Sequence, residues 1–339
     1  MDFNYTVLMT DYAWPSVDPE RKVLSEIGAE LIVAETGAED ELVSLAPQAD
    51  GILTCWEQTT TAVVRAAERC QVIGRCGIGL DNIDVKTATE LGIVVTNVPA
   101  YCIDEVSDHT MALLLACARK ISLFDREVKS GNWVRDVGPP VYRIRGKTLG
   151  IVGFGKIGRA LVPKARAFGL DVVVYSPSLS PDIAKSCGVE KAELSELLAR
   201  SDFITIHAPL NANTEKLFGK EQFRQMKETA YIINTSRGGI IDTSALYGAV
   251  KEGWIAGAGL DVLAEEPPAP DEPLVELDNI VITPHAAFAS EESTYDLEVS
   301  AARAVADVLI GKMPESVVNQ EVLESPLLRA KTLGNQANG

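Results

Sequence analysis

The stretch that decides the fold is "TLGIVGFGKIGRA", residues 148–160. An apolar run leads directly into three glycines with the spacing G-x-G-x-x-G, at Gly153, Gly155 and Gly158. The first glycine permits a tight turn, the second lets a pyrophosphate approach the backbone, and the third lets helix and strand pack closely. Amide groups at the helix N-terminus then face the anion. Within a strand–turn–helix unit the motif predicts dinucleotide binding rather than a merely structural turn.

On both sides of this motif, short β-branched runs alternate with helix-like segments. Alternation of this kind predicts parallel sheets covered on both faces by helices. At 339 residues the chain is longer than one core usually supports, so we expect two Rossmann-like or flavodoxin-like α/β domains. Strands are expected at 5–9, 30–34, 51–55, 71–76, 93–97, 148–155, 171–176, 202–207, 230–236, 255–262 and 279–284, and long helices at 103–120 and 291–311.

Composition excludes several classes of function. The chain has 48 acidic and 31 basic residues, a net charge of −17, which opposes binding to nucleic acid and to anionic membranes. The N-terminus lacks the pattern of a secretory signal, and the apolar run at 111–118 is too short to cross a bilayer. The six cysteines show no CxxC or zinc-type spacing, so we expect reduced thiols in a cytoplasmic protein and no metal site.

The cofactor motif departs from the usual pattern at one position. An acidic residue is expected about 20 positions after the glycines, where it bonds the adenosine ribose, but Ser176 stands there. A serine could bond a ribose hydroxyl or a 2′-phosphate. However, no Arg or Lys lies between Ser176 and Ala184 to neutralise that phosphate. We therefore expect NAD with relaxed discrimination, and NADP remains possible.

Charged or titratable groups follow three strands of the second series. Arg237 lies in a glycine-rich turn, Asp261 lies at the end of the next strand with Glu265 and Glu266 after it, and His285 ends "IVITPH". Ligands of open α/β sheets bind at the carboxyl ends of strands. A histidine transfers protons near neutral pH, a carboxylate can fix its tautomer, and an arginine can hold a substrate carboxylate. Beside a nicotinamide, this set would reduce a 2-keto acid.

The motifs "VGFGKIGRA", "HAPLNANT", "INTSRGGIID", "GAGLDVLAEEPP" and "ITPHAAF" resemble those of the D-isomer-specific 2-hydroxyacid dehydrogenases. "GRCGIGLDNIDV", "LGIVVTNVPAY" and "RIRGKTLGIVGFG" are most similar to the subgroup that includes the C-terminal-binding protein corepressors. The resemblance implies that Arg237, Glu266 and His285 are catalytic. Relatives that oxidise formate carry glutamine in place of this glutamate, so Glu266 argues against formate.

The resemblance also implies two sets of binding residues. The substrate set pairs the backbone amides of Ile78 and Gly79 with the side chains of Arg75, Trp56 and Phe288, whose two aromatic rings favour an apolar or extended substrate side chain. Asp261 would bind the nicotinamide carboxamide. The cofactor-binding residues expected are Gly153, Phe154, Gly155, Lys156, Ile157, Gly158, Ser176, Pro177, His207, Ala208, Pro209, Thr214, Thr235, Ser236 and Asp261.

In this family the nucleotide domain is inserted into the substrate domain. The resemblance therefore implies a substrate domain formed by 1–101 and 291–339 and a dinucleotide-binding domain formed by 102–290. It also implies a homodimer, with the helical stretch after Tyr101 forming much of the interface. The expected partner is a small 2-keto or 2-hydroxy acid.

Less specific readings stay open at several positions. His207 is more simply a structural residue or part of the lining of the cofactor cleft, and His109 a packing residue. Arg237 could pin a loop, and Asp261 could cap a turn. The leading function is an NAD(P)-dependent D-2-hydroxyacid dehydrogenase. The alternative is an NAD(H)-sensing protein-interaction module like the corepressors, which retain the same three catalytic residues.

Overall fold

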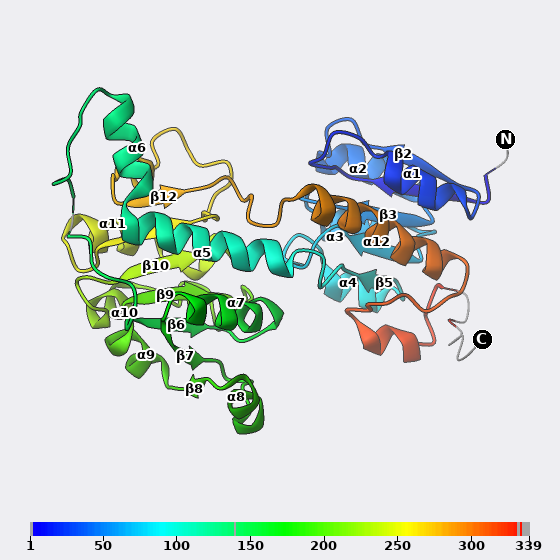
Figure 1. The fold of residues 1–339 in the computed structure, drawn as a ribbon. Coiled ribbons are helices and arrows are strands. Elements are labelled where there is room, and N and C mark those ends of the chain that lie inside the picture. The colour runs from blue at the N-terminus through cyan, green and yellow to red at the C-terminus, as the bar shows by residue number, and fades with distance from the viewer. Residues whose placement is uncertain (1–2, 139, 331–332, 334–339) are drawn as a thin grey trace. The chain divides into compact units, whose positions relative to one another are not determined.

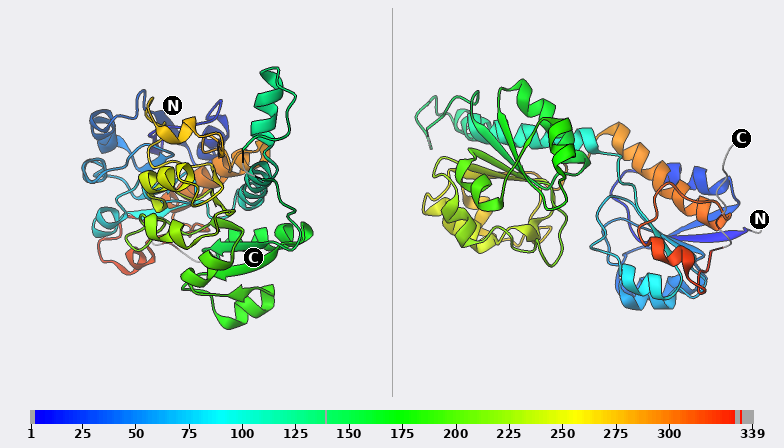
Figure 2. Two further views of the ribbon diagram at one scale, coloured as in Figure 1. Left: turned by 90° about the vertical axis from the view of Figure 1, so that its left-hand side faces the viewer. Right: turned by 90° about the horizontal axis from the view of Figure 1, so that it is seen from below.

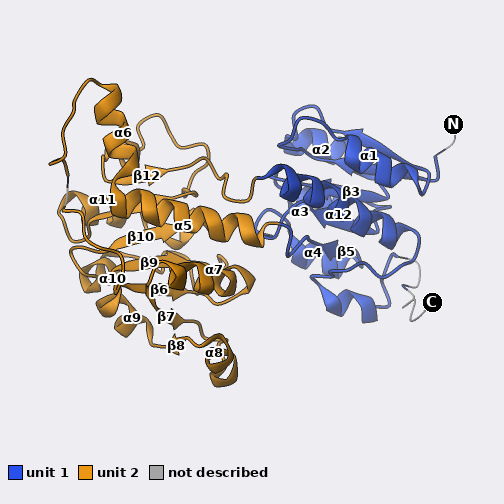
Figure 3. Ribbon diagram, viewed as in Figure 1, with its two compact units in different colours: residues 1–101, 290–339 blue, residues 102–289 orange. Residues whose placement is uncertain are grey.

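The structure is a computed structural model that describes residues 3–138, 140–330 and 333. The chain divides into two compact units, Met1–Tyr101 with Ser290–Gly339, and Cys102–Ala289 (Figure 3). Residues 331–332 and 334–339, which fall in the expected substrate domain, lie outside the described residues. We refer to the two parts as unit 1 and unit 2.

Unit 1 is built on a five-stranded sheet in which every described strand pair is parallel. The strand order is β2-β1-β3-β4-β5, the flavodoxin-like arrangement. β1 therefore lies between β2 and β3, and the chain changes direction across the sheet at this point. The strands are β1 (Tyr5–Met9), β2 (Ala29–Val33), β3 (Gly51–Thr54), β4 (Val72–Arg75) and β5 (Val94–Thr96).

Helices cover both faces of this sheet (Figures 1 and 2). One face packs against α1 (Asp18–Ser25) and α12 (Glu291–Leu309), and the other against α2 (Glu39–Leu45), α3 (Thr61–Ala66) and α4 (Val85–Glu90). Side-chain caps fix several helix starts: Asp84 accepts from the Thr87 amide, and Ser290 forms a capping box with Ser293. The segment after α12 returns to β5, where Asn319 accepts a bond from the Val95 amide.

Unit 2 carries a seven-stranded sheet, again with all described pairs parallel, in the order β12-β11-β10-β9-β6-β7-β8. The chain runs outward from β6 to β8 and then returns to β9 on the other side of β6. The switch point is therefore the boundary between β6 and β9. The strands are β6 (Thr148–Val152), β7 (Asp171–Tyr175), β8 (Glu190–Lys191), β9 (Phe203–Ile206), β10 (Tyr231–Asn234), β11 (Gly257–Leu260) and β12 (Ile280–Ile282).

The helices of unit 2 also form two layers. α5 (Ile103–Arg119), α7 (Lys156–Ala167) and α8 (Pro181–Cys187) share one core cluster with the sheet. α9 (Leu194–Arg200), α10 (Lys220–Gln225) and α11 (Thr243–Lys251) share the other. α6 (Ile121–Lys129) projects from unit 2 in both figures and leads into a long loop. Short 3-10 helices lie at Ala46–Gln48, Gly238–Ile240, Pro273–Glu276 and Gln320–Glu324.

The predicted fold class, two parallel-sheet α/β domains, is confirmed. Each expected strand is present, with ends shifted by a few residues, and the two long helices are α5 and α12. β8 and α6 were not anticipated. Within the described part of the chain, no helix is both long and apolar enough to cross a bilayer.

Candidate functional site

The glycine loop has the geometry that its sequence predicts. Gly153 has a φ of +91°, and a Cβ on it would lie 2.6 Å from the Ala208 amide nitrogen. A Cβ on Gly158 would lie 2.7 Å from the Gly153 carbonyl oxygen. Both positions therefore need glycine, the first for the turn and the second for close packing of α7 on β6.

Gly155 differs from the other two glycines because packing does not require it. No heavy atom beyond its chain neighbours lies within 4 Å of the Cβ that another residue would place there, so the space beside it is open. It is the N-cap of α7, a 12-residue helix, so amide groups of the first turn border this open space. Lys156 is exposed beside it. The cradle fits a pyrophosphate in size, donors and charge. Phe154, in contrast, is buried in the core, so only its backbone can border a cofactor.

The loop after β7 presents hydroxyls instead of a carboxylate. Ser176 is 5% exposed, and its Oγ lies 3.2 Å from the Ser178 Oγ. The structure also brings a cation to this loop, since the Lys191 Nζ donates to the Leu179 carbonyl at 2.8 Å. Sequence reasoning missed Lys191 because β8, which carries it, has only two residues and no recognisable pattern.

The loops after β9 and β10 meet each other. Ser236 Oγ donates to the Ala208 carbonyl, and Thr235 Oγ1 lies 2.9 Å from Thr110 Oγ1 on α5. Thr214 Oγ1 donates to the Pro209 carbonyl at 2.6 Å and so closes the turn that follows Pro209. These contacts fix the backbone beside the glycine loop.

His207 is held in the same region and is not poised for acid–base chemistry at neutral pH. Its Nε2 lies 3.0 Å from Thr205 Oγ1, and burial lowers its pKa from 6.5 to about 4. The ring is therefore neutral at physiological pH. This supports the reading of His207 as a structural residue or part of the cofactor cleft.

Arg237, Glu266 and His285 follow β10, β11 and β12, three neighbouring parallel strands, so all three lie at the carboxyl edge of the sheet. His285 Nδ1 lies 2.6 Å from Glu266 Oε2. Glu266 Oε1 accepts from the Leu263 amide at 2.8 Å. Arg237 is partly buried and donates to the Ser236 carbonyl at 2.8 Å. The structure thus brings together the three groups that the sequence singles out.

The charge state of Glu266 results from opposing effects. Burial raises its pKa, but the bond from His285, the Leu263 amide and the positive charge of Arg237 together outweigh it. The net result is a pKa below the ordinary value of 4.5. Glu266 is therefore a carboxylate at neutral pH and accepts from His285 Nδ1–H, which fixes the tautomer of the ring.

Asp261 anchors the loop that carries the histidine. It is 2% exposed, and its carboxylate accepts bonds from the Thr283 hydroxyl and from the amides of Ala286 and Ala287. His109 on α5 is partly buried and contacts Thr283 at 2.9 Å. The structure therefore supports a turn-capping role for Asp261, whereas its expected contact with a carboxamide stays a prediction.

His285 itself has a φ of +52°, a left-handed conformation that residues other than glycine seldom adopt. Its amide bonds to the Asp261 carbonyl at 2.8 Å, which holds this backbone in place. The Phe288 ring stands edge-on to the imidazole, with centroids 6.4 Å apart. The surrounding hydrogen bonds therefore offset the strain of this backbone conformation.

The expected substrate-binding residues of unit 1 cluster at the carboxyl edge of its own sheet. Trp56 follows β3, and Arg75 ends β4 with its guanidinium 5.8 Å from the Trp56 ring. Arg75 is only 6% exposed, and its Nε has no hydrogen-bond partner. Ile78 and Gly79 lie in the loop after β4, where the Ile78 carbonyl accepts from Asn97 at 2.9 Å.

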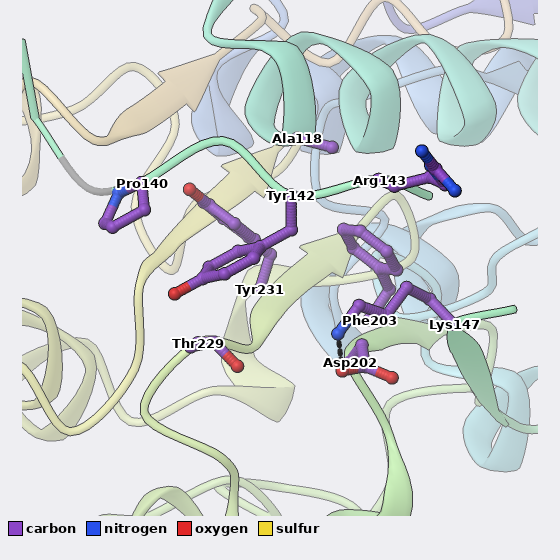
Figure 4. Close-up of a pocket in the computed structure, with 9 residues that line it drawn as sticks. All are labelled: Ala118, Pro140, Tyr142, Arg143, Lys147, Asp202, Phe203, Thr229 and Tyr231. Carbon is purple, nitrogen blue, oxygen red and sulfur yellow. Dashed lines mark hydrogen bonds and ion pairs between the residues drawn. The ribbon is translucent and has the colours of Figure 1, made fainter. Parts of the chain in front are cut away.

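A pocket on unit 2 lies at the opposite edge of the sheet (Figure 4). Lys147 and Asp202 precede β6 and β9, and Tyr231 is the first residue of β10, so the pocket is at the amino ends of the strands. Lys147 pairs with Asp202 at 3.1 Å and lies over the Tyr142 ring. Ligands of such sheets bind at the carboxyl ends, so this pocket is separate from the candidate site.

Comparison with known proteins gives the family. A model described as "D-isomer specific 2-hydroxyacid dehydrogenase, NAD binding domain" matches residues 111–287, the span that holds the glycine loop and Arg237, Glu266 and His285. The chain belongs to the D-isomer-specific 2-hydroxyacid dehydrogenase family.

Relatives in this dehydrogenase family carry several names. The chain is 44% identical to a glyoxylate reductase of Korarchaeum cryptofilum over 77% of this chain and 80% of that protein. It is 41% identical to a D-3-phosphoglycerate dehydrogenase of Methanocaldococcus jannaschii over 97% of this chain but only 64% of that protein. The crystal structure of a D-lactate dehydrogenase from Aquifex aeolicus with NAD and lactic acid matches with a TM-score of 0.82 and 27% identity, covering 92% of this chain and 98% of that one.

As a dehydrogenase of this family, the protein is an oxidoreductase that interconverts D-2-hydroxyacids and 2-keto acids with a nicotinamide dinucleotide. The predicted enzyme class and cofactor class are thereby confirmed. The relatives compared are named as oxidoreductases, so they lend no support to the interaction-module alternative. The closer likeness to the corepressor subgroup stays a resemblance of motifs.

Proposed function

We propose that Arg237, Glu266 and His285 are the catalytic residues and that the physiological substrate is a 2-keto acid, or the matching D-2-hydroxyacid, with an apolar or extended side chain. The observation that carries the catalytic part is the 2.6 Å contact between His285 Nδ1 and Glu266 Oε2. The Arg237 charge acts on the same carboxylate, and the three groups follow adjacent strands of the sheet that bears the glycine loop. Acid, orienting carboxylate and anion-binding cation are thus assembled at one edge.

Each residue then has a distinct part in the reduction. Arg237 binds the substrate carboxylate and polarises the neighbouring carbonyl. His285 donates the Nε2 proton to the carbonyl oxygen, and Glu266 stabilises the charged ring and holds its tautomer. The hydride for C2 would come from a reduced nicotinamide held beside these residues, which would be oxidised in the same step. In the oxidative direction His285 takes the proton back.

The cofactor-binding residues form the second part of the proposal. Gly153 to Gly158 would hold the pyrophosphate, and the loops that begin at His207 and Thr235 would border the nicotinamide half. We assign NAD with relaxed discrimination, because Ser176 bears no charge that would repel a 2′-phosphate. Comparable kcat/KM for NADH and NADPH, within about tenfold, is the expected result.

The substrate class rests on two aromatic rings at the expected pocket positions. Trp56 is 38% exposed beside Arg75, and Phe288 stands next to His285. Exposed aromatic surface favours an apolar substrate side chain. Glyoxylate, which has no side-chain carbon, is the second candidate substrate, because relatives of this chain are named glyoxylate reductases.

A substrate panel decides between the two candidates. Purified protein would be assayed with NADH and NADPH on glyoxylate, pyruvate, 4-methyl-2-oxopentanoate and phenylpyruvate, following cofactor absorbance. We expect kcat/KM to rise with apolar side-chain size by about tenfold or more from glyoxylate to the best substrate. A clear preference for glyoxylate would replace our substrate class by the second candidate.

The catalytic assignment has its own test. His285→Ala should lower kcat by about a hundredfold or more, because the proton donor is lost. NADH affinity and the thermal midpoint, measured on the same preparation, should stay near those of the unsubstituted protein. Turnover that survives in His285→Ala would refute the assignment.

We also propose a cytoplasmic homodimer. The six cysteines are free thiols and five of them are buried, as in proteins of reducing compartments. α5 is packed in the core of unit 2, but α6 and its following loop expose large apolar side chains. Trp133 is 90% exposed, Ile121 58% and Val128 49%. Exposed apolar side chains of this kind support contact with a second copy.

A further inference from the structure

The sheet of unit 1 has a switch point of its own, between β1 and β3. In open α/β sheets a ligand crevice forms where the strand order reverses, outside the carboxyl ends of the two strands. Asp11 lies in the loop that follows β1, and Trp56 lies in the loop that follows β3. Trp56 belongs to the proposed substrate pocket, whereas Asp11 has been given no role.

Asp11 bonds to the backbone of the loop that carries Trp56. Its Oδ1 accepts from the Cys55 amide at 3.0 Å, and its Oδ2 accepts from the Trp56 amide at 2.7 Å. The Thr10 hydroxyl donates to the same Oδ1 at 2.7 Å, and Thr10 is 1% exposed. Each carboxylate oxygen therefore has an assigned donor, and two consecutive amides are fixed by one side chain.

Asn82 holds the same loop by its carbonyl groups. Its Nδ2 donates to the Cys55 carbonyl at 3.2 Å and to the Glu57 carbonyl at 2.9 Å, and its side chain is buried. The loop of residues 55–57 is thus clamped between an acceptor, Asp11, and a donor, Asn82. A loop held on both sides presents its side chain in one direction at little entropic cost.

The side chain so presented is the Trp56 ring, against the Arg75 guanidinium at 5.8 Å. Arg75 is held in turn by a bond from its Nη1 to the Cys76 carbonyl. The Trp56 ring forms an apolar surface, and the Arg75 guanidinium places a positive charge beside it. Its position depends on the loop backbone, and therefore on Asp11.

We propose that Asp11 is a positioning residue for substrate selection: by fixing the amides of Cys55 and Trp56 it sets the Trp56 ring against which the substrate side chain packs. This rests on the proposed function, which places Trp56 in the substrate pocket. Asp11 touches neither substrate nor cofactor in this scheme. Its loss should therefore change discrimination between substrates rather than the chemical step.

The test compares the ratio of kcat/KM for phenylpyruvate to kcat/KM for glyoxylate across variants. Asp11→Asn keeps the size of the side chain but replaces one accepting oxygen by an NH2 group, which cannot accept from an amide. Trp56→Ala removes the ring. Asp40→Asn is the matched control, because Asp40 is an exposed acid on α2 of the same unit and the charge change is identical.

We expect Trp56→Ala to lower the ratio by about tenfold or more, and Asp11→Asn by about three- to tenfold, with the loss mainly in KM for phenylpyruvate. Asp40→Asn should leave the ratio unchanged. The double variant Asp11→Asn/Trp56→Ala should fall no further than Trp56→Ala alone, since both changes act through the same ring. If Asp11 acted on the ratio by a route other than the Trp56 ring, the two losses would multiply instead.

The outcomes separate this inference from the proposed function. An unchanged ratio in Trp56→Ala would remove Trp56 from the pocket and overturn both. A lowered ratio in Trp56→Ala with an unchanged ratio in Asp11→Asn would leave the pocket standing and overturn only the role of Asp11. Should Asp11→Asn fail to fold, Thr10→Val, which removes the hydroxyl that orients the carboxylate, must lower the ratio in the same direction for the inference to stand.

Discussion

At the scale of single residues, the charge of Glu266 decides how the site responds to pH. Its pKa lies below 4.5 in the folded protein, although burial opposes this, because His285, the Leu263 amide and Arg237 favour the ionised form. A depressed pKa in the folded state means that the contribution of the carboxylate is complete above about pH 4.5 and is lost only as the pH falls through the lower folded value. The pair should therefore be intact throughout the neutral range.

We expect Glu266→Gln to lower kcat/KM by about ten- to a hundredfold at neutral pH, because the amide cannot stabilise the charged ring. The difference from the unsubstituted enzyme should stay constant down to about pH 4.5 and shrink only as the pH falls through the lower pKa of the folded state, where the native carboxylate is protonated as well. The measurement is a pH–rate profile. Glu265→Gln, the neighbouring acid, is the control, and an equal loss there would contradict a specific role for Glu266.

Residues differ in how far their positions could be foreseen. Arg237, Glu266 and His285 could be predicted to lie together because each follows an expected strand, and parallel strands bring their carboxyl ends to one edge. The contact of Asp11 with Trp56 could not, because the two residues are 45 positions apart and the bond is to a backbone amide. Every residue except proline has a backbone amide, so the residue type does not indicate which amide donates to a partner in the fold.

At the scale of elements, the turn from β6 into α7 contains one glycine that we expect to affect stability and another that we expect to affect cofactor binding. Gly153→Ala places a Cβ 2.6 Å from a backbone nitrogen at a φ of +91°, so it should destabilise unit 2 by about 1–3 kcal/mol. Gly155→Ala meets no atom within 4 Å and should fold normally. Its methyl group would occupy the open cradle, and the Kd for NADH should rise about tenfold.

Thermal unfolding and NADH titration of the two variants check this contrast. Equal losses of stability would show that the loop is uniformly structural and that the cradle is not where the pyrophosphate lies.

Helices and strands could be predicted from the sequence where the hydrophobic pattern extends over enough residues. α5 and α12, with 17 and 19 residues, follow from periodicity, and the fully buried strands β3, β9 and β10 follow from continuous apolar runs. α6 was not anticipated because it has only nine residues and begins directly after Lys120, where the expected helix of 103–120 ends. β8, with two residues, is defined only by its pairing with β7.

At the scale of the whole molecule, net charge and exposed apolar surface oppose each other in self-association. Each copy carries a charge of −17, so two copies repel at low salt. The apolar side chains of α6 and its loop, with Trp133 at 90% exposure, favour association. Screening shortens the range of the repulsion to about 8 Å at physiological ionic strength without weakening the apolar contact. The proposed dimer should therefore tighten as salt rises.

Sedimentation velocity of the unsubstituted chain at about 0.02 and 0.15 M salt tests the balance, with a smaller dissociation constant expected at the higher salt. Trp133→Ser should weaken the dimer by about thirtyfold, since an exposed indole at an interface centre commonly contributes about 2 kcal/mol. Phe168→Ser, at another aromatic residue of unit 2 that is 45% exposed, should leave it unchanged. If the unsubstituted chain sediments as a monomer at both salt concentrations, or if Phe168→Ser dissociates it as readily as Trp133→Ser, the surface around α6 is not the contact that joins two copies.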